Sequence, residues 1–155
     1  MHAICAQNGT KNNEQKEERF MKLNLFAICE GAFNHNGHLT IVNTKDFINC
    51  VKFPHRADQL GLAIRLEFNA SEEGEHPFEL GFIDPVGTYT TMAKSPINVQ
   101  KAEQNTLFCL AANLSGFIFT HPGIYKFVVK VDDKEIGCEE FMLKLTKSVN
   151  DGKQE

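Results

Sequence analysis

The sequence contains no tryptophan and only two tyrosines, although 13 of its 155 residues are phenylalanine. Sugar-binding β-domains commonly present Trp or Tyr rings to the ligand, so this composition disfavours carbohydrate binding. No apolar run approaches the roughly 18 residues that a membrane span requires, and no interaction with a membrane is expected. Lys and Arg number 16 against 20 Asp and Glu, a net charge of −4, so the chain offers no basic field for nucleic acid.

The cysteines form no recognisable pattern. There are five, an odd number, and no two of them are spaced as C-x-x-C. Cys29, Cys50 and Cys109 lie inside apolar runs, where free thiols behave as small hydrophobic side chains. This usage favours a reducing compartment, and we therefore expect a cytoplasmic protein.

Both ends of the chain are polar. Residues 1–20 consist largely of Gln, Asn, Lys and Glu and read as a mobile tail, and residues 148–155 read as a second one. Met21 begins the apolar pattern and is a candidate second start, while the apolar stretch after it is too short for a convincing signal peptide. We expect one domain over residues 21–147, a length at which folding buries about 68–70% of the unfolded surface.

Apolar side chains between the tails recur with a period near two, and no amphipathic helix longer than a few turns is indicated. The clearest alternation covers residues 60–68, where Leu, Ile and Phe should face a core and the opposite face, with Gly61, Ala63, Arg65 and Glu67, should mostly meet water. Asn36-Gly37 predicts a tight hairpin turn, Pro54 ends a strand at Phe53, and a change of parity near Glu139 indicates a bulge. Further strands are expected over residues 22–29, 39–42, 78–83, 117–119 and 125–131. Residues 106–114 are apolar on both faces and are expected to form a central strand, with a short helix as the alternative.

About eight strands at close spacing predict an all-β fold, namely an antiparallel two-sheet β-sandwich of immunoglobulin-like or jelly-roll type. The segments at residues 89–92 and 97–99 are broken by Pro96 and suggest an exposed edge. The phenylalanines fall mostly on inward-facing positions of the alternating pattern and are assigned to the core by default. Tyr125 is expected to pack in a corner of the sandwich and to hydrogen-bond to the backbone.

Segments near both ends of the domain resemble those of known β-sandwich proteins. Residues 119–127, which include Pro122-Gly123-Ile124-Tyr125, lead into a strand and a short Asp-rich turn at residues 131–136. This looks like the last hairpin of many bacterial β-sandwich modules. Together with residues 25–32 and the Phe53-Pro54 step, the stretch from about residue 21 to 145 resembles a family of small bacterial all-β proteins of unknown function. The resemblance implies a compact intracellular sandwich and supplies no catalytic residues.

Candidate chemistry is sparse. His35 and His38 have an H-x-x-H spacing that could hold a divalent metal with Glu30, but the same residues also form an ordinary polar turn, which is the favoured interpretation. No Ser lies in a G-x-S-x-G setting, and Cys29 and Cys109 are expected to be buried and inert. The acidic run that includes Glu72 reads as a solvated loop.

These observations favour a non-enzymatic β-sandwich that acts through protein contacts, as an oligomer subunit or an adaptor. The edge at residues 89–99 could receive an added strand from a partner or from a second copy. The alternative is a module that binds a small molecule, a carbohydrate or a metal. Candidate binding residues are Tyr89, Thr91 and Tyr125, no cofactor is expected, and catalytic residues are not indicated.

Overall fold

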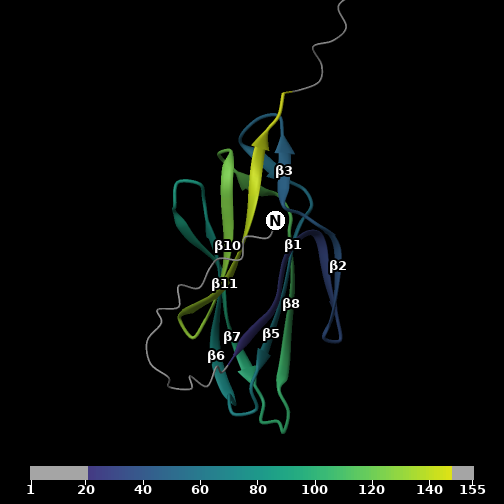
Figure 1. Ribbon diagram of the computed structural model, residues 1–155, viewed down its shortest axis with the longest axis vertical. Coiled ribbons are helices and arrows are strands. Elements are labelled where there is room, and N and C mark those ends of the chain that lie inside the picture. The colour runs from purple at the N-terminus through teal and green to yellow at the C-terminus, as the bar shows by residue number, and fades with distance from the viewer. Residues whose placement is uncertain (1–20, 148–155) are drawn as a thin grey trace, which may run out of the picture.

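The computed structural model describes residues 21–147, which form strands, turns and irregular segments but no helix (Figure 1). The predicted all-β class is confirmed. The predicted tails and the proposed start at Met21 concern residues 1–20 and 148–155, which lie outside the described residues. The strands are β1 (Lys22–His35), β2 (His38–Thr44), β3 (Phe47–Cys50), β4 (His55–Ala57), β5 (Leu60–Phe68), β6 (Gly74–Ile83), β7 (Tyr89–Val99), β8 (Thr106–Leu114), β9 (Phe117–Phe119), β10 (Gly123–Val131) and β11 (Lys134–Leu145).

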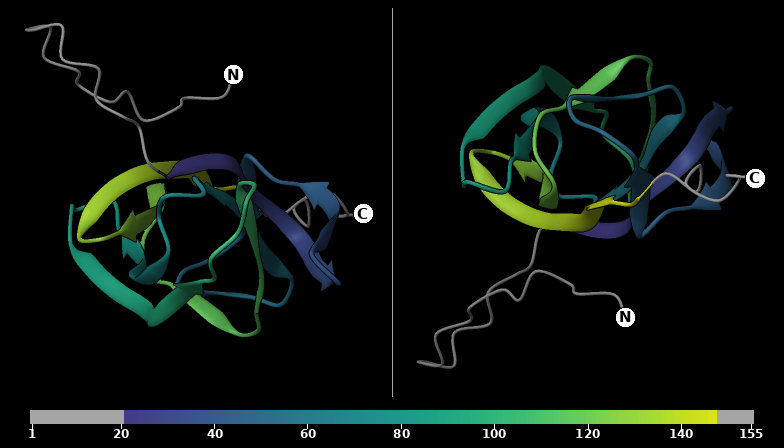
Figure 2. Two further views of the ribbon diagram at one scale, coloured as in Figure 1. Left: turned by 90° about the horizontal axis from the view of Figure 1, so that it is seen from below. Right: turned by 90° about the horizontal axis from the view of Figure 1, so that it is seen from above.

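Three sheets contain these strands. One has the order β2-β1-β5-β8, the second has the order β3-β11-β10-β6-β7, and β4 pairs with β9 alone. Neighbouring strands are antiparallel except for β3 and β11, which run parallel, so the expectation of purely antiparallel pairing was wrong at that position. Viewed along the long axis, the strands enclose the interior, and β11 lies next to β1 at one side (Figure 2).

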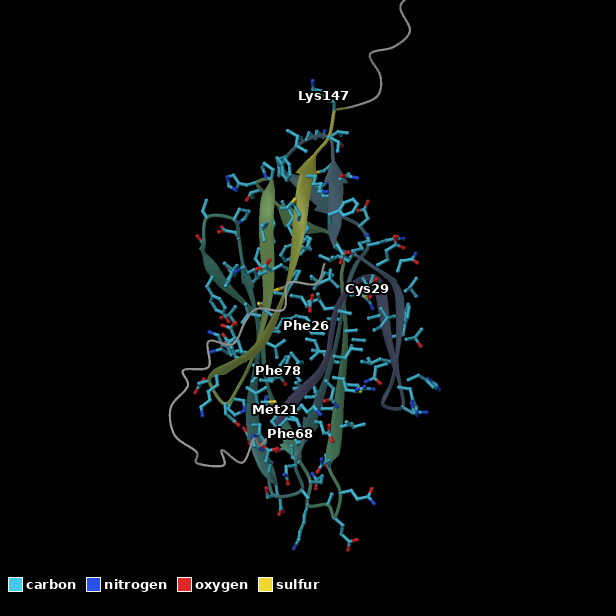
Figure 3. All side chains as sticks on the ribbon, viewed as in Figure 1. Met21, Phe26, Cys29, Phe68, Phe78 and Lys147 are labelled. Carbon is cyan, nitrogen blue, oxygen red and sulfur yellow. The ribbon has the colours of Figure 1, made fainter. Side chains whose placement is uncertain are left out.

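The two larger sheets share one core. Alternate residues of β5, among them Leu62, Ile64 and Leu66, are fully buried, as are Phe127 and Val129 of β10 in the other sheet. Burying each such side chain contributes roughly 1.5–3 kcal/mol, so this shared core is the main source of stability. Figure 3 labels two further aromatic residues of the core, Phe68 and Phe78, and the partly buried Phe26 that packs against it.

Tyr125 occupies the corner that its sequence context predicts. Its side chain is 1% exposed, and its ring stacks on Phe82 and Phe141. The hydroxyl donates to the carbonyl of His121 at 2.6 Å and accepts from the His121 N–H at 3.1 Å. The predicted corner is therefore confirmed, and the turn that precedes β10 is tied to the core through this one side chain.

A second face of β5 is covered, which the alternating pattern did not predict. Gly61 and Ala63 were expected to face water, but β1 bends at Cys29, leaves β5 and pairs with β2, and the resulting hairpin covers them. A Cβ atom on Gly61 would lie 3.0 Å from Cys29 Sγ and 3.0 Å from Gly31 Cα. The absence of a side chain at this position therefore permits the close approach.

The β1–β2 hairpin is fixed at both ends. Its tip has positive φ at Asn36 and Gly37, which confirms the predicted tight turn. Nearer the bend, the Asn113 side chain of β8 accepts from the Ala32 N–H at 3.0 Å and donates to the Ala32 carbonyl at 2.8 Å. Asn113 thus replaces the backbone of a neighbouring strand at this position.

Several predicted strands have different limits in the structure. The strand expected to reach Phe53 ends at Cys50, and the unpredicted β4 follows it. Strand β7 is continuous through Pro96, because Pro96 lies opposite Pro77 in a pair that exchanges no hydrogen bonds, so the strand loses no donor to β6. Strand β8 lies at the end of its sheet rather than in the centre. The bulge in β11 lies at Ile136, a few residues before Glu139, where the register with β10 shifts.

Two further expectations are corrected. Phe33 and Phe47 are exposed by 57% and 48%, so not every phenylalanine belongs to the core. Glu72 is 8% exposed, and both of its carboxylate oxygens accept hydrogen bonds, so it is not a solvated loop residue. Among residues 21–147, no helix is long and apolar enough to cross a bilayer.

Candidate functional site

The outer face of the five-stranded sheet carries exposed apolar side chains on three adjacent strands. Side chains alternate between the two faces of a strand, so the buried residues fix the direction of their neighbours. In β11, Phe141 and Leu143 point into the core and Met142 points outward. In β10, Tyr125 points inward and Ile124 points outward. Phe47 of β3 is likewise exposed.

The strand register places these three residues side by side. Phe47 lies opposite Met142 in the parallel pair, and Met142 lies opposite Ile124 in the antiparallel pair. Their exposed fractions are 48%, 38% and 46%. We call Phe47, Met142 and Ile124 the apolar row. It crosses the adjacent strands β3, β11 and β10, roughly at right angles to them.

Charged side chains flank the apolar row along β11. Glu140 precedes Met142 by two residues and Lys144 follows it by two, so all three share the outer face. The Glu140 carboxylate lies 3.1 Å from Lys126 Nζ on β10. Lys144 Nζ lies 4.3 Å from the centre of the Phe47 ring, a cation–π distance. One side of the row is therefore bounded by the Glu140–Lys126 ion pair and the other side by Lys144.

The same outer face continues toward β7 as a polar cluster, which contains two predicted binding residues. The Tyr89 ring lies directly on Gly81, where a Cβ atom would overlap it, and Lys130 Nζ lies 4.2 Å from the ring centre. The Thr91 hydroxyl donates to Glu79 at 2.7 Å. This bond is the main reason why the pKa of Glu79 lies below its ordinary value. Tyr89 and Thr91 are thus brought together on one face.

A shallow pocket of about 250 Å³ adjoins this cluster. Its walls include Pro77 and Pro96, which lie opposite each other on β6 and β7, and the side chains of Lys94 and Lys130. Small-molecule sites usually measure about 300–1,000 Å³, so this pocket is small for a ligand site.

Strand β7 lies at the free edge of its sheet, as predicted, but half of that edge is closed to an added strand. Pro77 and Pro96 face each other and neither has an N–H, so they cannot exchange hydrogen bonds. The Asp132 N–H donates to the Pro77 carbonyl at 3.0 Å, which shows that this carbonyl points toward β10. In an antiparallel pair, the backbone groups of two residues that are not hydrogen-bonded to each other point away from each other, so the backbone nitrogen of Pro96 faces the free edge. Because this nitrogen carries no hydrogen, a strand added at the edge would find no donor at Pro96. The other half is irregular because Met92 is an extra residue in the register.

The remaining candidates do not join the surface. Tyr125 is buried and its hydroxyl is engaged by His121, so it presents nothing to a ligand. His35 and His38 are paired at the exposed tip of the β1–β2 hairpin, whereas Glu30 lies at the other end and bonds to Asn43. Within residues 21–147, no group of three or more His, Cys, Asp and Glu side chains is arranged to hold a metal ion.

The free thiols also have structural settings. Burial raises the pKa of both Cys29 and Cys50, which disfavours the thiolate that nucleophilic chemistry needs. Cys109 was expected to be buried, but it is half-buried, and its thiol donates to the Gly37 carbonyl at 3.3 Å.

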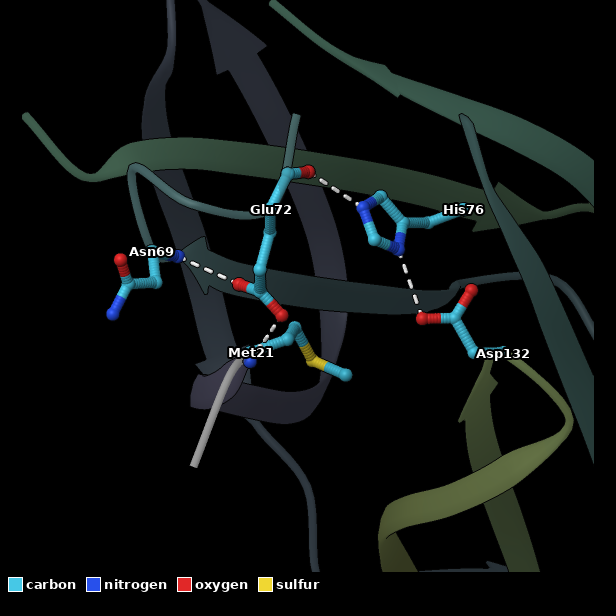
Figure 4. Close-up of polar contacts among 5 residues, drawn as sticks. All are labelled: Met21, Asn69, Glu72, His76 and Asp132. Atoms are coloured by element: carbon cyan, nitrogen blue, oxygen red, sulfur yellow. Dashed lines mark hydrogen bonds and ion pairs between the residues drawn. The ribbon is translucent and has the colours of Figure 1, made fainter. Parts of the chain in front are cut away.

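A polar network joins two turns, at residues 69–72 and at Asp132, to the start of β1 and to His76 of β6 (Figure 4). The two ring nitrogens of His76 lie 2.8 Å from Asp132 Oδ2 and 2.7 Å from the Glu72 carbonyl oxygen. Burial lowers the pKa of His76, but the hydrogen bonds to Asp132 and Glu72 outweigh it and raise the pKa. The Glu72 carboxylate accepts from the N–H groups of Met21 and Asn69, both at 2.7 Å. All these groups satisfy one another, which indicates a structural role.

Sequence reasoning missed the apolar row and the His76 network. A signal for the row was present, because Met142 lies between two core positions of an alternating strand. What the pattern lacked was the pairing of β3 with β11, which brings Phe47 beside Met142. The His76 network depends on two turns meeting, and neither turn has a distinctive motif.

Comparison with known proteins places most of this domain in one family. The model of a family of unknown function (DUF6941) matches residues 24–144, which confirms the expected likeness to an all-β family of unknown function. No curated protein matches the chain.

Solved structures resemble the fold only loosely. A Pseudomonas fluorescens alkylpurine DNA glycosylase, AlkC, is 14% identical with a TM-score of 0.47, and the alignment covers 80% of this chain and 30% of that one. A β-glucosidase from Listeria innocua is 9% identical with a TM-score of 0.48, over 79% of this chain and 16% of that one. The chain thus spans less than a third of these proteins. An immunoglobulin-like protein from Pseudomonas aeruginosa is 13% identical with a TM-score of 0.34, over 80% and 96% of the two chains.

Proposed function

We propose that this chain, which belongs to the family of unknown function DUF6941, is not an enzyme and works through protein contacts made by the outer face of its five-stranded sheet. The apolar row is the observation that carries the proposal. Its three large side chains expose apolar surface on adjacent strands, and removing such surface from water is favourable by roughly 25 cal/mol per Å², from which the entropic cost of association is subtracted.

Other features support a binding role for this face over the alternatives. The pocket beside Pro77 is small, and the acids and imidazole of the His76 network are engaged with one another. The free edge of β7, the contact surface expected from the sequence, has a missing donor at Pro96 and an irregular register at Met92. The proposed contact surface is therefore the face of the sheet and not its edge.

The finer assignment of the fold is part of this proposal. The orders β1-β5-β8 and β11-β10-β6-β7 correspond to the two sheets of an immunoglobulin-like sandwich, with β2 and β3 as additions at the sheet edges. The hydrogen bonds of Tyr125 match the tyrosine corner of such sandwiches. Both features favour the immunoglobulin-like alternative over a jelly roll. The cytoplasmic location remains a prediction from the sequence.

Site-specific photocrosslinking in cells tests the contact surface. A photoreactive phenylalanine analogue replaces Met142, and in a matched control it replaces Leu107, which is also exposed but lies on β8 of the other large sheet. We expect irradiation to attach a protein to the Met142 derivative and not to the Leu107 derivative. The proposal would be contradicted if the Met142 derivative gave no protein adduct, or if both positions gave the same adducts in equal amount.

A further inference from the structure

We propose that the occupant of the apolar row is the apolar row of a second copy of this chain, which makes the protein a two-fold symmetric dimer. This inference rests on the proposed function, because it uses the same face. It assigns the partner, which the proposed function leaves open.

The order of outward side chains on β11 is the basis for the assignment. Along this face the strand presents Glu140, Met142 and Lys144, an acid and a base at equal spacing on either side of an apolar residue. A two-fold axis that lies in the interface and runs along the row places Met142 against Met142 of the second copy. The same rotation places Glu140 of each copy opposite Lys144 of the other.

The remaining members of the row fit the same operation. Phe47 and Ile124 lie on the two strands beside β11 and in register with Met142, so each lies on the axis and meets its own counterpart. The contact is therefore isologous, with apolar side chains along the centre and two equivalent ion pairs at its borders. Face-to-face packing of two sheets with strands about 30° from alignment is a common arrangement and requires no change of backbone.

A different axis would not give this complementarity. If the axis ran along β11 instead, Glu140 would face Glu140 of the second copy and Lys144 would face Lys144. Like charges in direct opposition are destabilising, so the charges choose the axis along the row. Glu140 already forms an ion pair with Lys126 of its own chain at 3.1 Å, so Lys144 of the second copy would join that pair, and the Phe47 ring beneath Lys144 holds its ammonium group beside the row.

A charge exchange tests the proposed symmetry. Sedimentation velocity of the full chain over a wide range of concentrations is expected to show a monomer–dimer equilibrium. Glu140→Lys and Lys144→Glu should each weaken dimerisation about tenfold, since each reversal acts at two equivalent contacts. The double variant restores opposite charges across the axis and should recover part of the affinity, because a lysine at position 140 lies beside Lys126 of the same chain. Circular dichroism and thermal unfolding of each variant establish that it remains folded.

Disulfide trapping supplies an independent measurement. With Met142→Cys, the two introduced thiols meet on the axis, and mild oxidation should produce a covalent dimer faster than with Leu107→Cys, the matched exposed control on β8. A wild-type chain that stays monomeric throughout, a double variant no better than the single ones, or equal trapping at both positions would overturn the dimer. If the chain is monomeric while Met142 still crosslinks to another protein in cells, the inference fails and the proposed function stands.

Discussion

The charge of His76 is determined by the two hydrogen-bond acceptors that face its ring. A neutral imidazole has only one N–H, yet both ring nitrogens of His76 face oxygen acceptors, Asp132 Oδ2 and the Glu72 carbonyl. The protonated ring satisfies both at once. The Phe68 ring packs against the imidazole, with ring centres 5.1 Å apart, and keeps water from one side of it.

The stability of the protein should therefore depend on the charge of His76. Its pKa is raised above 6.5 in the folded state, so the contribution is fully present below pH 6.5 and is lost as pH rises through the folded-state pKa. We expect the free energy of unfolding of the wild type to fall by about 1 kcal/mol more than that of His76→Gln between about pH 5.5 and about pH 8.5. Urea denaturation at several pH values measures both profiles.

Asp132→Asn provides the matched control for this prediction. It retains a side-chain oxygen facing His76 but removes the charge, so its pH dependence should lie between those of the wild type and His76→Gln. If the free energy of unfolding of the wild type and of His76→Gln changed with pH in parallel, the pKa of His76 would be the same in the folded and unfolded states, and the prediction would be wrong.

At the scale of single residues, the sequence predicts positions that local chemistry determines. Tyr125 and the Asn36-Gly37 turn were predicted because a Pro-Gly-x-Tyr segment and an Asn-Gly pair restrict the backbone nearby. The burial of Glu72 was not predicted, because one of the two N–H groups that bind its carboxylate belongs to Met21, which lies far away in the sequence; the other belongs to Asn69.

Among the elements, the crossing of β1 over β5 is a close contact between two backbones. Strand β1 can bend at Cys29 and carry the β1–β2 hairpin across β5 because Gly61 leaves room beneath it. The alternation in β5 correctly predicts its inner face, but it treats the other face as solvent-exposed. A long strand that changes partners halfway has no signature in the period of its apolar residues.

Gly61→Ala should consequently destabilise the protein. The added methyl group would lie 3.0 Å from both Cys29 Sγ and Gly31 Cα, and overpacking of this kind costs roughly 1–3 kcal/mol. Equilibrium unfolding in denaturant measures the loss. The control is Gly31→Ala, in the adjoining strand, whose Cβ would meet its nearest neighbour, the Phe33 ring, at 3.6 Å. Equal stabilities for the two variants would show that β1 can move away from Gly61 at little cost and would contradict the prediction.

For the molecule as a whole, the fold class follows from the sequence but the order of strands does not. Alternation and turn residues identify most strands, whereas the pairing of β3 with β11 joins segments near opposite ends of the domain. The apolar row exists only through that pairing. The surface on which the proposed function depends is thus a property of the tertiary fold, and Phe47 alone would have been assigned to the core.

The central claim is that the apolar row is the surface at which this protein makes contacts. The most direct measurement is NMR of the full chain labelled with ¹³C at the methionine methyl groups, of which the sequence has four. The Met142 signal should shift as the protein concentration rises, while the signal of Met92, on β7 at the other edge of the same sheet, stays in place. A Met142 signal that stays fixed at all concentrations, and also in the presence of any protein that crosslinks to the chain in cells, would contradict the account.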